Sequence, residues 1–139
     1  MKRVTGIIIG LVMVVFVGMA SAEDPCCLYG CGIIKGVVKL CGSFIGQEGA
    51  IVTLGGRSVG YFDSAATITD ATGYYIFTGQ LPVCYIHTGT VTGTYFMYNC
   101  CGKPNEIYKA SASWRFRSFN QGELITLVSN LKLLWAGYF

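Results

Sequence analysis

The chain has 139 residues, enough for one domain of ordinary size, and only 12% of them are charged. The formal net charge is +3 at pH 7, and Lys and Arg are scattered. A nucleic-acid surface needs a dense basic patch, so we expect no nucleic-acid partner. Abundant Tyr, Phe and Gly with so little charge are typical of an extracellular domain that packs against another surface.

The first 22 residues have the pattern of a secretory signal peptide. Lys2 and Arg3 precede an apolar run at 7–19, and small residues follow at 20–22. The apolar run is shorter than the roughly 20 residues that span a bilayer, and no charged stop-transfer segment follows it. We therefore expect cleavage after Ala22, which removes Lys2 and Arg3 and lowers the net charge from +3 to +1. The mature chain is then extracellular, at the cell surface or periplasmic, with no membrane span.

All seven cysteines follow the predicted leader, and in an exported domain disulfides are the first expectation. A metal site is the alternative, but the chain has no CxxC pair and one histidine, His87, so we expect no metal. Because seven is odd, at least one thiol is free or bonded to another chain. The disulfide candidates are Cys26, Cys27, Cys31, Cys41, Cys84, Cys100 and Cys101; the first three lie in a Cys-rich segment, 23–31, ahead of one domain at 32–139.

Beyond this segment the chain alternates as β-strands do. The stretch 33–40 places Ile34, Val38 and Leu40 on one face, and 50–54 alternates in the same way. After 67–69, the sequence Asp-Ala-Thr-Gly at 70–73 predicts a turn that leads into a β-branched and aromatic strand at 74–78.

The next two predicted strands, 83–88 and 94–98, flank a Gly/Thr-rich stretch at 89–93, which predicts a hairpin turn there. Such a hairpin brings Cys84 close to Cys100 and Cys101 at its open end. We expect one of that pair to join Cys84 or Cys41, and the other to tie down the segment that carries Cys26, Cys27 and Cys31.

The C-terminal part completes the strand pattern. At 113–117, Trp114 and Phe116 alternate inward with two outward arginines, and a further strand follows at 131–135. The stretch 124–128 is a strand or the start of a short helix, and its β-branched residues favour a strand. Seven or eight short strands, with turn signals about every ten residues, predict an all-β fold: a seven- to eight-stranded antiparallel β-sandwich after the cleaved signal peptide.

Several of these stretches together have a family pattern. They are Gly-Val-Val at 36–38, Gly-Ala-Ile-Val-Thr-Leu at 49–54, Thr-Asp-Ala-Thr-Gly-Tyr-Tyr-Ile-Phe at 69–77 and Leu-Pro at 81–82. Over residues 32–98 the chain resembles the carboxypeptidase regulatory-like domains, which are transthyretin-like (prealbumin-like) β-sandwiches related to the B-type repeats of bacterial surface adhesins. It departs from that pattern at Cys84, where the family has Gly, and at 47–48, where a proline is absent.

The resemblance implies a non-catalytic module that acts as a stalk, spacer or adhesive unit. In its turn motif we expect Asp70 to accept backbone N–H groups, Gly73 to take a positive φ, and Tyr75 and Phe77 to point into the core.

The residue types and motifs of the sequence do not predict an enzyme. The chain contains no G-x-S-x-G elbow and no phosphate-binding glycine motif. A lone histidine such as His87 in a hairpin is far more often structural or at the surface than catalytic. We expect no catalytic residue and no cofactor. Two hypotheses remain: a structural subunit that assembles with copies of itself, and a module that binds carbohydrate or another surface protein through a Tyr-rich sheet face.

The C-terminal stretch 131–139 bears on the first hypothesis, because it contains one charge and no proline. A strand there either closes the core or lies at an edge that can pair with another copy. The candidate residues of such an assembly edge are Leu131, Leu133, Trp135, Tyr138 and Phe139.

Overall fold

The computed structural model describes residues 28–139, so the predicted signal peptide, Cys26 and Cys27 lie outside the described residues. The described part is all-β, as predicted, and no helix within it is long and apolar enough to cross a membrane. Its elements are β1 (Tyr29–Leu40), β2 (Ile51–Gly55), the 3-10 helix η1 (Arg57–Tyr61), β3 (Ala66–Ile68), β4 (Tyr74–Pro82), β5 (His87–Met97), β6 (Glu106–Phe116), β7 (Leu124–Val128) and β8 (Leu131–Tyr138).

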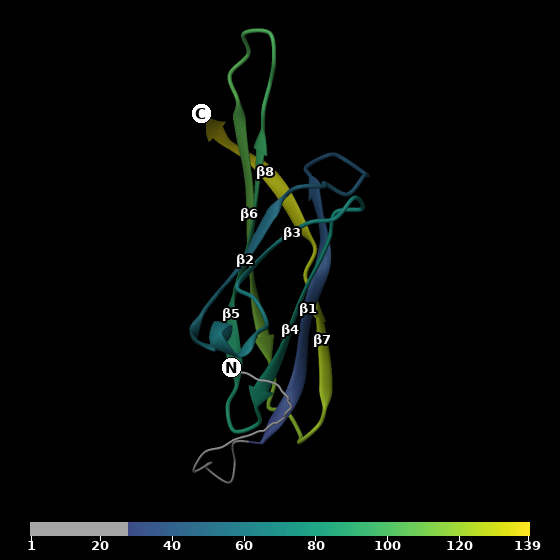
Figure 1. The fold of residues 1–139 in the computed structure, drawn as a ribbon, viewed down its shortest axis with the longest axis vertical. Helices are drawn as coiled ribbons and strands as arrows, with labels where there is room; N and C mark the ends of the chain where they lie inside the picture. Colours follow the sequence, from purple (N-terminus) through teal and green to yellow (C-terminus); the bar gives the residue numbers. More distant parts are fainter. Residues whose placement is uncertain (1–27) are drawn as a thin grey trace.

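The strands follow the order β3-β2-β5-β6-β8-β1-β4, with β7 also paired to β1, and wrap into a nearly closed barrel-like sandwich (Figure 1). Phe62, in the connection between η1 and β3, forms an isolated antiparallel bridge with Gly79 of β4. Most pairs are antiparallel, but β7 and β8 both run parallel to β1, which corrects the purely antiparallel expectation. β7 and β8 lie one after the other along β1, and both run in its direction. Between them, the Val37 N–H of β1 donates a hydrogen bond to Asn130 Oδ1 (2.9 Å).

The core contains the residues that the alternation placed inside. Every second residue of β1 from Gly30 to Val38 is buried, and both aromatic residues predicted to point inward from 113–117 are buried. The buried apolar side chains of the predicted strands are Ile34, Val38, Ala50, Val52, Leu54, Tyr75, Phe77, Trp114, Phe116, Leu131 and Leu133; Leu40 is partly buried and packs against them.

The predicted hairpin turn at 89–93 is wrong, because β5 runs through it without interruption from His87 to Met97. The two glycines in this stretch make room for packing. A Cβ at Gly89 would lie 2.4 Å from the Trp114 ring, and one at Gly93 would lie 3.1 Å from Leu131 Cδ1. The chain instead turns on either side of β5, at 83–86 and at 98–105.

The turn motif at 70–73 is confirmed. Asp70 Oδ1 accepts hydrogen bonds from the N–H groups of Thr72 (2.9 Å) and Tyr74 (3.0 Å), and Gly73 has a φ of +79°. Hydrogen bonds to the carboxylate, with the Thr72 hydroxyl as the largest cause, lower the pKa of Asp70. Tyr75 and Phe77 follow, both buried, and their rings pack edge to face in the core.

The folded protein should become less stable in acid because of a carboxylate in the loop before β7. Hydrogen bonds from Arg117 and from the Asn120 N–H lower the pKa of Glu123 from 4.5 to about 2. A carboxyl whose pKa is lower in the folded state stabilises the fold above the unfolded pKa, and this contribution disappears as the pH falls through the folded pKa. We expect the melting temperature of Glu123→Gln to fall less than that of the unaltered chain between pH 4.5 and pH 2. Glu48→Gln, at an exposed carboxylate outside the described ion pair, is the control and should follow the unaltered chain.

Candidate functional site

One end of the molecule is drawn out into a three-stranded projection. The β5–β6 hairpin reaches beyond the other strands, and the end of β8 lies beside it (Figure 1). The register pairs Thr94–Met97 of β5 with Glu106–Lys109 of β6, and these residues of β6 with Leu134–Tyr138 of β8. We call these three segments, 94–97, 106–109 and 134–138, the arm.

Both outer strands of the arm have an unpaired edge. On one side, β2 pairs with β5 only as far as Thr94. On the other side, β1 pairs with β8 only as far as Leu133, whose carbonyl accepts the Cys41 N–H at 2.9 Å. Within residues 28–139, no strand pairs with the outer edge of 95–97 or of 134–138. The arm therefore presents two free backbone edges.

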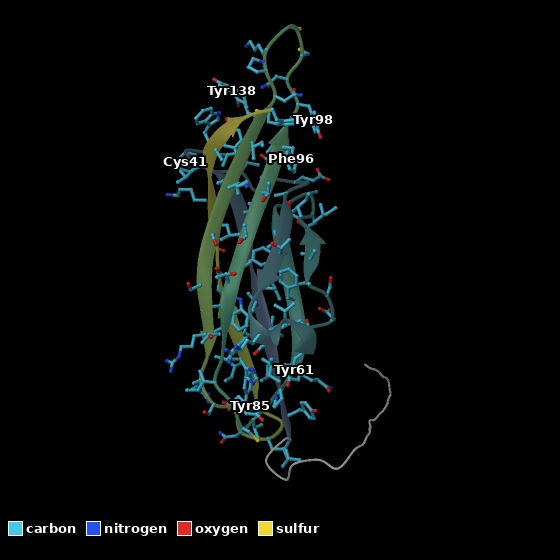
Figure 2. The ribbon with its side chains drawn as sticks, turned by 90° about the vertical axis from the view of Figure 1, so that its left-hand side faces the viewer. Cys41, Tyr61, Tyr85, Phe96, Tyr98 and Tyr138 are labelled. Carbon is cyan, nitrogen blue, oxygen red and sulfur yellow. The ribbon has the colours of Figure 1, made fainter. Side chains whose placement is uncertain are left out.

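Both faces of the arm carry exposed aromatic side chains. On one face, Phe139 packs edge-on against Phe96 and against Tyr98, each with ring centroids 5.5 Å apart. On the other face, Trp135 packs against Tyr138 at 5.1 Å, next to the cross-strand pair of Tyr108 with Trp135. Trp135, Tyr138 and Phe139 are each at least 50% exposed. Figure 2 shows Phe96, Tyr98 and Tyr138 together at this end.

The structure separates the five residues of the predicted assembly edge into two groups, and their role in assembly stays a prediction. Leu131 and Leu133 are wrong as edge residues, because the first half of β8 pairs with β1 and both leucines are buried in the core. Trp135, Tyr138 and Phe139 lie in and after the second half, which has left β1 and pairs with β6 alone. From Leu134 onward, β8 pairs with β6 instead of β1, and its large apolar side chains are exposed instead of buried.

Most other unpaired strand edges in the described chain differ from the arm; β7 (Leu124–Val128), which pairs only with β1, is an exception, because it too is uncharged. The edge strand β3 is only three residues long, and β4 is bridged by Phe62 and by the Asp63 N–H, which donates to the Thr78 carbonyl. The part of β6 below the arm ends at Arg115 and Phe116, with Arg117 directly after it. Shortness, coverage and charge are ways in which soluble proteins protect strand edges. The free segment of β8, 134–138, contains no charged residue and is not covered by another strand.

The predicted disulfide scheme is wrong for the described cysteines. Cys31, Cys41, Cys100 and Cys101 are free, whereas Cys84 is disulfide-bonded. Cys84 and Cys100 flank opposite ends of β5, and an 11-residue strand spans on the order of 35 Å. The scheme failed because it depended on the hairpin turn at 89–93, which would have folded those ends together.

A second site lies at the opposite end, around His87 and a serine that the sequence analysis missed. A pocket of about 400 Å³ is lined by residues that include Arg57, Ser58 and Thr88. Ser58 Oγ lies 2.6 Å from His87 Nδ1, and His87 Nε2 lies 2.8 Å from the Pro82 carbonyl oxygen. Because a carbonyl only accepts, Nε2 carries the proton and Nδ1 accepts the Ser58 hydroxyl. Ser58 and His87 lie 29 positions apart in the sequence, and no motif between them could have revealed the pair.

The chemistry of this pair favours a structural role. A serine hydrogen-bonded to histidine is the core of many nucleophilic sites. Here Ser58 is 7% and His87 2% exposed, and the imidazole is held by a backbone carbonyl. The two hydrogen bonds connect η1 to the end of β4 across the start of β5. Within the described residues, no three His, Cys, Asp or Glu side chains gather as metal ligands.

Comparison with known proteins found no family model, no curated protein and no solved structure that matches this chain. The resemblance to the carboxypeptidase regulatory-like domains therefore stays a prediction from the residues that carry it.

Proposed function

We propose that this protein is an exported, non-catalytic β-domain that assembles with copies of itself, edge to edge, through the arm. The observation that carries the proposal is a three-stranded projection with two free backbone edges and exposed aromatic side chains on both faces. Export itself rests on the signal-peptide pattern at 1–22.

Charge does not oppose another copy of this chain as the partner of the arm. Residues 133–139 contain no charged side chain, so pairing β8 with a strand of a second copy sets no like charges opposite each other along it. The register of β6 with β8 shifts by one residue between Ile107 and Tyr108, where Ala136 of β8 has no partner on β6.

The geometry of the arm favours an open assembly. Its two free edges belong to different strands, β5 and β8, and both strands run antiparallel to β6 and so parallel to each other. If the β8 edge of one subunit joins the β5 edge of the next, each subunit keeps one edge free. A contact between two different surfaces that does not close into a ring generates a filament. Backbone pairing then joins the subunits, and the aromatic rings on the two faces are buried beside it.

The second hypothesis, carbohydrate binding on a Tyr-rich face, has less support. Tyr95 is half-buried and packs against the core. Phe96 and Tyr98 lie edge-on to Phe139, with interplanar angles of 83° and 84°, so the three rings do not form a flat stacking platform.

The substitution Trp135→Lys tests the proposal. It removes a large exposed apolar side chain and places a lysine on the β8 edge, as soluble monomers do. We expect the unaltered protein to form ladders or filaments, seen by size-exclusion chromatography and electron microscopy, and the variant to be a folded monomer. Because Trp135 lies outside the core, its melting temperature should change little.

The matched control is Ile68→Lys, an exposed apolar residue on β3 at another sheet edge, which should assemble like the unaltered protein. An unaltered protein that stays monomeric at high concentration would refute self-assembly. A discrete dimer would refute the open filament and indicate pairing of β8 with β8.

A further inference from the structure

The tip of the arm holds two adjacent thiols that the proposed assembly does not use. Cys100 and Cys101 are both exposed, and their Sγ atoms lie 2.8 Å apart. They begin a turn that closes with a hydrogen bond from the Lys103 N–H to the Cys100 carbonyl (3.3 Å). Two further hydrogen bonds, from the Asn99 N–H to Asn105 Oδ1 and from Asn99 Nδ2 to the Pro104 carbonyl, hold the loop together below the turn (each 2.9 Å).

The backbone at this turn is unusual for a cysteine. Cys101 has a φ of 65° and Gly102 a φ of 81°, the positive values of both central residues in a type I′ turn. Asn, Asp and Gly are preferred at such positions. Cys101 is the one non-glycine residue with a positive φ among residues 28–139. Backbone strain of this kind gathers at functional positions, which points to the thiol as the reason for cysteine here.

The redox state of the rest of the chain is the second observation. Cys84 is disulfide-bonded, and disulfides persist where thiol oxidants are present. At the tip, Cys100 and Cys101 are already each other's nearest thiol partner through their 2.8 Å contact.

We propose that Cys100 and Cys101 form a redox-active dithiol at the tip of the arm, which a low-molecular-weight disulfide oxidises to a vicinal disulfide within the same chain. The thiolate of one cysteine attacks a sulfur of the external disulfide and expels one thiolate, which leaves a mixed disulfide. The second cysteine loses its proton to the solvent and attacks the sulfur of the first, and the second external thiolate leaves. The dithiol loses two electrons and two protons, and the external disulfide becomes two thiols.

The order of the two attacks follows from the hydrogen bond between the thiols. The hydrogen bond with Cys100 is the largest cause that raises the pKa of the Cys101 thiol. The thiolate is the nucleophile, so this hydrogen bond disfavours Cys101 as the first attacker.

This inference goes beyond the proposed assembly and does not depend on it. Closing the pair within one chain removes both thiols from cross-linking between copies. The Trp135→Lys variant, monomeric if the assembly proposal holds, should therefore form the vicinal disulfide as readily as the unaltered protein.

The test uses the purified protein with oxidised glutathione, followed by chymotryptic digestion without reduction. Cleavage after Tyr98 and Tyr108 releases the peptide 99–108, which contains these two cysteines and no other. We expect this peptide to lose two hydrogens, to carry no glutathione, and to regain the hydrogens with a dithiol reductant. Before oxidation, phenylarsine oxide, which bridges two neighbouring thiols, should bind the pair and block its oxidation.

The single variants Cys100→Ser and Cys101→Ser are expected to gain one glutathione on peptide 99–108 and to lose the bridged arsenical. Cys41→Ser, at another exposed free thiol, should behave like the unaltered protein at this peptide. The proposal is overturned if the peptide from the unaltered protein keeps both thiols, carries glutathione at the end of the reaction, or is linked to the same peptide of a second copy.

Discussion

Replacing Gly89 with alanine is expected to destabilise the fold by about 3 kcal/mol, the upper part of the range for overpacked cores. A Cβ at this position would lie 2.2 Å from the Gly55 carbonyl oxygen and 2.4 Å from the Trp114 ring. Neither neighbour can move easily, because Gly55 is paired to β5 and the Trp114 side chain is buried and donates its indole N–H to the Thr90 carbonyl. Urea unfolding, followed by tryptophan fluorescence, measures the loss.

Gly60→Ala is the matched control for Gly89→Ala. An added Cβ at Gly60 meets nothing within 4 Å, and Gly60 does not have a positive φ, so its free energy of unfolding should be nearly unchanged. Equal stability of the two variants would show that β5 does not pack against β2 and Trp114 at Gly89, and would restore the loose hairpin turn that the sequence predicted.

Replacing His87 with alanine is expected to cost about 2–4 kcal/mol, also measured by urea unfolding. The imidazole is buried and makes hydrogen bonds to both Ser58 and the Pro82 carbonyl, so its removal leaves buried polar groups without partners and opens a cavity among aromatic rings. Thr88→Ala, the exposed neighbour on β5, should change stability by less than about 0.5 kcal/mol.

A double-mutant cycle separates the Ser58–His87 hydrogen bond from the cavity. If the two side chains stabilise the fold through each other, Ser58→Ala should cost less in the His87→Ala background than in the unaltered protein. Additive effects would contradict the inference that Ser58 and His87 together connect η1 to the end of β4.

The parts of the fold that were predicted correctly are those with a local cause. Alternation at 33–40 and 113–117 placed Ile34, Val38, Trp114 and Phe116 inside, because a strand exposes its residues to the two faces in turn. The turn at Asp70–Gly73 was predicted for the same reason, since one carboxylate and one glycine satisfy it within a few residues. For the candidate site, the aromatic, nearly uncharged C-terminus identified two residues of the arm, Trp135 and Tyr138, and Phe139 directly after it.

The remaining features depend on partners that are distant in sequence, and only the tertiary structure decided them. Gly89 and Gly93 have the composition of a turn, but they lie in a strand because Trp114 and the leucines of β8 fill the space that side chains would take. Leu133 and Trp135 are two residues apart in β8, where alternation predicts the same face. Leu133 is in the core and Trp135 is exposed, because β1 ends beside Leu133. The cysteine pairing failed with the misplaced turn. By itself the sequence determined where strands form and which face of each is apolar, because these follow from neighbouring residues. Which strands pair, where an edge stays open and which thiols meet depend on how long each neighbouring strand is, and that is settled only when the sheet closes.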